Sequence, residues 1–131
     1  MPWTNGALNS CVGTEFYHNL VLLRCIGGKS GKPRSVALLA TPLGNQFVLI
    51  ASAAGHEKNP SWYYNLKANP ECTLLIRNRG EIPFVAHEAE GEEREQAWNA
   101  ANTLYSNLMV AYQSRVERKI PILVLTPKTQ E

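Results

Sequence analysis

The sequence lacks the patterns that usually hold structural metals or disulfide frameworks. Its three cysteines form an odd set without C-x-x-C spacing, and its three histidines are not spaced as metal ligands. We therefore predict no metal, and buried or idle thiols in a reducing compartment. A chain of 131 residues can bury a core without such cross-links, so we expect a single domain over residues 1–131.

Long apolar runs and a strong net charge are also missing. No uninterrupted apolar run approaches the length of a membrane span, and the N-terminus has no charged segment followed by a long apolar one. A formal net charge of +2 is too small to indicate nucleic-acid binding. The sequence thus predicts a cytoplasmic protein with no stable membrane insertion and no nucleic-acid partner.

Two common nucleotide-binding motifs are absent as well. Gly28-Lys29-Ser30 imitates the end of a phosphate loop, but Leu23 stands where that motif needs another glycine. No G-x-G-x-x-G opens a helix after a strand, which excludes the Rossmann fingerprint.

What the chain does have is a basic, glycine-rich loop at residues 27–34, Gly-Gly-Lys-Ser-Gly-Lys-Pro-Arg. Glycines let backbone N–H groups approach a ligand closely, and Lys29, Lys32 and Arg34 supply charge that a phosphate could neutralise. The loop therefore indicates an anion site, with a solvated tight turn of the same composition as the alternative.

Short branched or alternating runs predict the strands of the fold. Gly, Pro and Asn residues bound these runs, and Pro42-Leu43-Gly44-Asn45 has the chemistry of a turn. Pro83 lies inside one run and indicates an edge position or a bulge there. The predicted strands cover residues 17–26, 35–41, 46–52, 71–77, 81–88 and 120–125.

Helical signals fall between these strands. Asn59-Pro60 predicts the start of a short helix over 61–68. An acidic opening and apolar residues at helical spacing predict a helix over 90–102, and a second piece over 108–117. Residues 1–16 are expected to form an N-terminal arm and 126–131 a tail. Hairpins with inserted helices indicate an antiparallel α+β barrel with a short helix after the third strand and a helical excursion before the last.

Three segments together resemble the deazaflavin-dependent nitroreductase family, split β-barrel proteins that use the reduced coenzyme F-420, an 8-hydroxy-5-deazaflavin. Residues 27–34 are similar to the family's G-R-K-[S/T]-G-x-x-R loop, and residues 48–52 with 58–70 form the most specific match. A third match lies near the C-terminus: Tyr105, Tyr112, Gln113 and residues 118–121. The resemblance implies a fold of the FMN-binding, pyridoxamine-phosphate-oxidase-like type.

The same resemblance implies a set of coenzyme-binding residues. Lys29, Ser30 and Arg34 look like the contacts of the phosphodiester and oligoglutamate tail. Two strand segments look like the lining of the ring: Ser35, Val36, Ala37, Leu38, Ala51 and Ser52. The short helix and the turn before it border the pocket through Lys58, Trp62 and Asn65. Without the resemblance, a role as a core anchor is slightly favoured for Trp62, and solvated surface is the alternative for Lys58.

The catalytic residues implied by the resemblance are Ser52, Tyr105 and Tyr112. Ser52 is expected near the reactive edge of the ring, and the tyrosines to orient an acceptor or donate a proton. Simple packing of the helical excursion is the alternative for each tyrosine. The implied activity is hydride transfer from reduced F-420 to a small electron-poor acceptor: a quinone, an activated enone or a nitro compound.

The chain departs from the family pattern at several positions. Gly28 stands where the loop usually has Arg, Ala53 where Lys is common, and Ala37 where proline is common. Leu108 or Met109 replaces a further tyrosine, which favours an apolar acceptor. Two alternatives follow: a split barrel that uses FMN, whose shorter phosphate tail needs fewer cations, and a non-catalytic binder of a lipid or other apolar ligand. Monomer and homodimer both remain open, as does peripheral contact with the inner membrane face.

Overall fold

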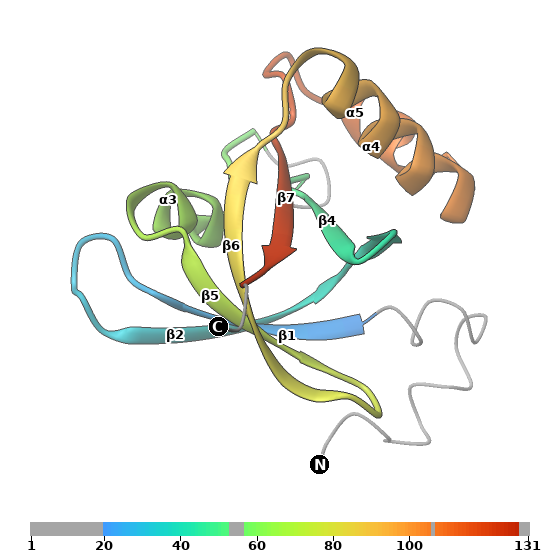
Figure 1. Ribbon diagram of the computed structural model, residues 1–131. Helices are drawn as coiled ribbons and strands as arrows, with labels where there is room; N and C mark the ends of the chain where they lie inside the picture. The colour runs from blue at the N-terminus through green and yellow to red at the C-terminus, as the bar shows by residue number, and fades with distance from the viewer. Residues whose placement is uncertain (1–19, 53–56, 106, 129–131) are drawn as a thin grey trace, which may run out of the picture.

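The computed structural model describes residues 20–52, 57–105 and 107–128, so the predicted arm over 1–16 and Ala53 lie outside the described residues (Figure 1). In chain order the elements are β1 (Leu20–Ile26), β2 (Pro33–Leu39), β3 (Thr41–Leu43), β4 (Gln46–Ile50), α3 (Ser61–Ala68), β5 (Glu71–Ile76), β6 (Gly80–Glu88), α4 (Gly91–Leu104), α5 (Leu108–Gln113) and β7 (Ile122–Pro127).

The strands form one antiparallel sheet that closes on itself. Its order is β2-β1-β5-β6-β7-β4-β3, so β2 and β3 lie at opposite edges. Only Ala40 separates these two strands in the chain, and consecutive Cα atoms lie about 3.8 Å apart. The sheet must therefore roll until its edges approach each other at Ala40, and Figure 1 shows the resulting curl. The predicted antiparallel α+β barrel is confirmed.

The region around Ala40 corrects one predicted boundary. The sequence predicts a strand over 35–41 and a turn that begins at Pro42. The structure instead starts β2 at Pro33, bends at Ala40, and pairs Thr41 with Val48 in the short hairpin of β3 and β4. The continuous apolar sequence gives no sign that the chain passes from one edge of the sheet to the other here. The break depends on the pairing partners, since β2 pairs with β1 whereas β3 pairs with β4.

Smaller corrections concern element ends. β4 stops at Ile50, two residues before the predicted end, and α4 continues to Leu104. α5 ends at Gln113, short of the predicted residue 117. β7 extends to Pro127, into the predicted tail, because Pro127 pairs with Phe84 of β6.

Pro83 lies where β6 changes from an edge to an interior strand. β6 pairs with β5 over its first part and with β7 only from Phe84 onward. Lys128 N donates to Pro83 O at 3.1 Å, so the backbone polar groups of Pro83 face the end of β7. Because N and O of one residue point to the same side of a strand, the missing N–H removes no bond to β5. The predicted edge position holds at this end of the strand.

Two apolar layers position the helices. The barrel interior holds Leu23, Leu74 and the edge-to-face pair Phe47 and Phe84, whose ring centroids lie 5.8 Å apart. On the outside of β7 and β4, a second cluster packs under α4: Val48, Ala89, Ala97, Ile122 and Val124. β7 is therefore buried on both faces, which explains its nearly unbroken apolar sequence.

Truncating Phe84 tests this layering. Phe84 is 1% exposed, whereas its neighbour Val85 points out of the barrel and is 37% exposed. We expect Phe84→Ala to lower the free energy of unfolding by about 3–5 kcal/mol through lost burial and a cavity. Val85→Ala, the control, should cost only about 0.5 kcal/mol. Urea denaturation measures both, and equal losses would contradict the assigned faces.

Candidate functional site

Two cavities meet at one side chain. The larger, about 1040 Å³, lies between the basic loop, the start of β2 and α3, and the smaller, about 230 Å³, lies between β2, the end of β4 and α5. Trp62 of α3 lines both and is only 6% exposed. The indole therefore forms a wall that the two cavities share.

The basic loop is organised around Ser30. Gly27 N donates to Lys32 O at 2.8 Å and Gly31 N to Gly27 O at 2.9 Å, with Gly31 at φ +69°. Ser30 Oγ accepts from Lys32 N at 3.2 Å and from Arg34 Nη2 at 3.3 Å. Because Ser30 Oγ accepts two bonds, its own O–H remains available to a ligand, and Arg34 is held beside it.

Asn65 joins this loop to α3. Asn65 Oδ1 accepts from Gly28 N at 3.0 Å, which satisfies a loop N–H with a helix side chain. A Cβ at Gly28 would lie 3.2 Å from Ala68 Cβ, tighter than ordinary contact. An arginine here would thus require the loop to rise from α3, which gives a physical reason for glycine at this position. Cys25 lines the same cavity, and burial raises its thiol pKa while a hydrogen bond with Asn65 opposes the rise.

The smaller cavity is mostly apolar. Ser52 is buried at its wall, and Leu108, Met109 and Tyr112 of α5 face it from the other side. The guanidinium of Arg115 lies 5.8 Å from the centre of the Tyr112 ring. Such a pocket suits a flat, weakly polar molecule.

Tyr105 lies in the same wall, but its hydroxyl is already engaged. It donates to Ala40 O at 2.7 Å, at the bend between the two sheet edges, and the side chain is 4% exposed. Burial raises the pKa of Tyr105 to about 12, although a hydrogen bond with Thr41 acts in the opposite direction. Tyr105 therefore stabilises the bend that shapes the pocket.

The structure divides the predicted site residues between the cavities. Seven line the larger one: Lys29, Ser30, Arg34, Ser35, Val36, Trp62 and Asn65. The smaller one is lined by Ala37, Leu38, Ser52, Tyr105, Tyr112 and, again, Trp62. Ala51 is buried next to Ser52 and Lys58 is exposed, but neither lines these two cavities.

Sequence reasoning missed the polar contacts of Arg118, Asn59 and Tyr64. Arg118 Nη1 donates to Asn59 Oδ1 at 2.5 Å, and Asn59 Nδ2 donates to the Tyr64 hydroxyl at 3.1 Å. Arg118 and Asn59 both fall within segments of the family resemblance, which was the available signal. Their separation of 59 positions along the chain hides the contact.

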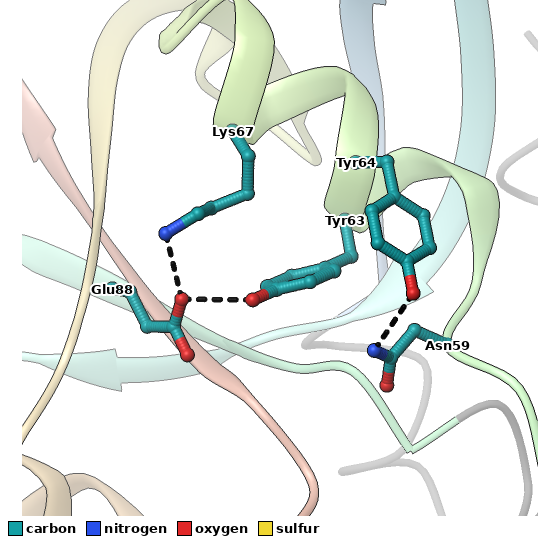
Figure 2. Close-up of polar contacts among 5 residues, drawn as sticks. All are labelled: Asn59, Tyr63, Tyr64, Lys67 and Glu88. Carbon is teal, nitrogen blue, oxygen red and sulfur yellow. Dashed lines mark hydrogen bonds and ion pairs between the residues drawn. The ribbon is translucent and has the colours of Figure 1, made fainter.

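A second cluster fixes α3 from the side of β6. Figure 2 shows Tyr63 and Lys67, one helical turn apart, directed at Glu88, with Tyr63 Oη donating at 2.8 Å and Lys67 Nζ at 2.9 Å. Burial acts to raise the pKa of Glu88, but hydrogen bonds from Lys67 and Tyr63 outweigh it and hold the pKa below its ordinary value. Burial, and then the bond to Glu88, raise the pKa of Tyr63 to about 12. This cluster orients the helix that carries Trp62 and Asn65.

No group of three or more His, Cys, Asp or Glu side chains among the described residues could hold a metal ion. Within the same residues, no helix is long and apolar enough to cross a membrane.

Fold and site together define a split-barrel protein with two adjoining cavities, one bordered by Lys29 and Arg34 and the other lined by uncharged side chains. The chain belongs to the F-420H(2)-dependent quinone reductase family, whose sequence profile matches residues 3–127. An F-420H(2)-dependent quinone reductase of Mycobacterium tuberculosis is 32% identical over 107 residues, which cover 81% of this chain and 72% of the relative.

Solved structures agree with this assignment. An F-420-H2 dependent reductase has a TM-score of 0.74 and 37% identity, covering 82% of this chain and 93% of the other. A chain described as a domain-swapped dimer has a TM-score of 0.75 and 36% identity, covering 82% and 79%. A pyridoxamine 5′-phosphate oxidase-type protein from Listeria innocua, at 15% identity and 86% coverage of both chains, has a TM-score of 0.60 and shows the shared fold alone.

The Glu88 cluster gives a pH-dependent prediction. Because its folded pKa is depressed, Glu88 contributes stability above its unfolded pKa, near 4.5, and loses it as the pH falls through the folded value. We expect Glu88→Gln to lower the free energy of unfolding by about 1 kcal/mol at pH 7. The difference from wild type should shrink towards zero in acid.

Urea denaturation from pH 7 to pH 3 measures this difference. Glu95→Gln, which removes the same charge from an exposed position on α4, is the matched control and should stay within about 0.5 kcal/mol of wild type. A difference for Glu88→Gln that is constant over the whole pH range would contradict the assigned linkage.

Proposed function

We propose that this protein is an oxidoreductase that uses reduced coenzyme F-420 to reduce small electron-poor acceptors, in particular quinones. The observation that carries the proposal is the pair of cavities on either side of Trp62: Lys29 and Arg34 line the larger one, and uncharged side chains line the smaller one. A molecule with an anionic tail and a flat ring fits this combination. Membership of a family named for the same activity supports it.

The residues present fit the coenzyme. Its phosphodiester and oligoglutamate tail needs several donors around one opening, and Lys29, Arg34, the Ser30 hydroxyl and loop N–H groups line the larger cavity. The family that the chain belongs to is named for F-420H(2). The deazaflavin coenzyme is therefore favoured over FMN, the alternative drawn from the sequence.

When bound, the reduced coenzyme supplies a hydride from its ring carbon. The chain's own residues bind, orient and exclude water. Lys29 and Arg34 would neutralise the tail, and the buried Trp62 forms the wall between the cavities. Ser52, buried at the wall of the apolar pocket, would donate a hydrogen bond to the ring.

Tyr112 is the residue that orients the acceptor and supplies a proton. It is half-buried on α5 and faces the apolar pocket, whereas the Tyr105 hydroxyl already donates to Ala40 O. A phenol suits this role because its ring packs against the acceptor while its tip forms a hydrogen bond. Tyr105 contributes through the shape of the pocket.

The acceptor class follows from the walls of the smaller cavity. Leu108 and Met109 offer apolar, adaptable contacts beside Tyr112. A quinone or an activated enone matches these contacts better than a polar nitro compound. The alternative of a non-catalytic lipid binder leaves Lys29 and Arg34 in the adjoining cavity without a role, and is not favoured.

The cellular setting is part of the proposal. Cys25 and Cys72 are buried free thiols, as expected in the reducing cytoplasm. Peripheral contact with the inner membrane face would bring the pocket to lipid-soluble quinones. We favour a homodimer over a monomer because one similar structure is described as a domain-swapped dimer.

Coenzyme affinity tests the cationic end. We expect Lys29→Gln and Arg34→Gln each to raise the Kd for oxidised F-420 about 10- to 100-fold, the equivalent of about 1.5–3 kcal/mol for a charged hydrogen bond. Arg79→Gln, in the exposed turn between β5 and β6, is the charge-matched control. Fluorescence titration at fixed salt measures these Kd values beside those for FMN. Equal Kd values for FMN and F-420 would contradict the proposed coenzyme.

Turnover tests the apolar end. Ser52→Ala and Tyr112→Phe should each lower kcat about tenfold or more while the coenzyme Kd changes by less than about threefold, because the lost groups act at the ring and the acceptor. Thr103→Ala on the exposed face of α4 is the control. Steady-state kinetics with a soluble quinone measure kcat. An unchanged kcat for either variant would contradict the role proposed for that residue.

A further inference from the structure

Arg118 lies in the segment between α5 and β7, and its guanidinium donates hydrogen bonds to several oxygen atoms. Its Nη1 donates to Ala51 O at 3.3 Å and to Asn59 Oδ1 at 2.5 Å, and its Nη2 donates to Ser52 O at 3.0 Å. These acceptors come from the two residues that follow β4 and from Asn59, which precedes Pro60, the N-cap of α3. One guanidinium thus joins the segment before β7 to two other parts of the chain.

The contact fixes the backbone next to a proposed catalytic group. β4 ends at Ile50; Ala51 N still donates to Pro121 O at 2.9 Å, but the strand register with β7 goes no further. The rigid fork of Arg118 donors takes over this task by holding both carbonyls. A lysine has no such fork and presents its donors from a single nitrogen. The location of Ser52 in the apolar pocket therefore depends on a residue that lines neither cavity.

Asn59 carries the constraint on to the larger cavity. Arg118 has only donors, so the Asn59 oxygen must face it, and the amide nitrogen then donates to the Tyr64 hydroxyl at 3.1 Å. The Tyr64 oxygen is an acceptor in this bond, which leaves its own proton for another partner. Tyr64 lines the larger cavity and is 56% exposed. Its O–H is thus oriented as a donor for an anionic group.

Gln113 positions Arg118 from the other side. Gln113 Nε2 donates to Arg118 O at 2.8 Å, and Gln113 Oε1 accepts from Ile120 N at 3.0 Å. Gln113 directly follows Tyr112 on α5. The wall that carries the proposed proton donor is therefore joined to the same cluster.

We propose that Arg118 is a positioning residue that sets Ser52 in the ring pocket and, through Asn59, presents the Tyr64 hydroxyl as a further donor to the anionic tail of the coenzyme. The sequence assigned no role to Arg118 or to Tyr64. The nature of the ligand rests on the proposed function, whereas the coupling between the two pockets rests on the contacts alone.

The first test uses the protein without coenzyme. Arg118→Gln removes the charge and the fork, and Lys119→Gln removes the same charge from the exposed neighbour. Hydrogen exchange followed by mass spectrometry should show at least tenfold faster exchange in peptides covering residues 48–52 and 57–64 for Arg118→Gln alone. Unchanged exchange in those peptides would overturn the positioning role. This outcome does not depend on the identity of the ligand.

The second test measures the effect on function in the wild type and three variants. We expect Arg118→Gln to lower kcat with a soluble quinone at least tenfold, and Tyr64→Phe to weaken F-420 binding about fivefold. In the double variant the Tyr64→Phe effect on Kd should vanish, because the phenol is no longer oriented. Additive effects on Kd would overturn the Asn59 link. Failure of the wild type to bind F-420 would instead reject the proposed function.

Arg118→Lys distinguishes a loss of kcat caused by lost geometry from one caused by unfolding. Lysine keeps the charge but lacks the fork, so kcat should stay close to that of Arg118→Gln while the unfolding temperature recovers towards wild type. Recovery of kcat together with stability would mean that charge alone suffices, and would overturn the proposed geometry.

Discussion

Most of this structure depends on the closure of the sheet at Ala40. One residue joins the two edge strands, so the sheet has to roll until β2 lies near β3. The Tyr105 hydroxyl bonds to the carbonyl at this bend, and α5 follows closely in the chain. Because β2 is brought across in this way, its residues line a cavity against α3 and another against α5. The composite site is therefore a consequence of barrel closure.

The two ends of β2 border different cavities. Its first residues follow the basic loop and border the larger cavity, and its last residues border the smaller one. α3 supplies the divider, Trp62, and is itself held by Glu88 on one side and by the Asn65 bond to the loop on the other. No charged side chain among the described residues lines the smaller cavity, and a low dielectric strengthens each hydrogen bond made inside such a pocket.

The departures from the family pattern have a structural context. Gly28 allows the loop to approach α3 so closely that its N–H reaches Asn65, and a longer residue there would separate the two. Leu108 and Met109 make one wall of the small cavity apolar without closing it.

Local sequence alone predicted most of the strands, the short helix after Asn59-Pro60 and the basic character of the 27–34 loop, because periodicity, turn residues and charge act over a few positions. The resemblance to the family made Trp62 and Ser52 candidate site residues. The tertiary structure decided which residues share a cavity, that Tyr105 serves the bend at Ala40, and that Arg118 reaches Asn59 and Ser52. These are contacts between segments more than fifty positions apart, and only the rolled sheet brings their atoms within hydrogen-bonding distance.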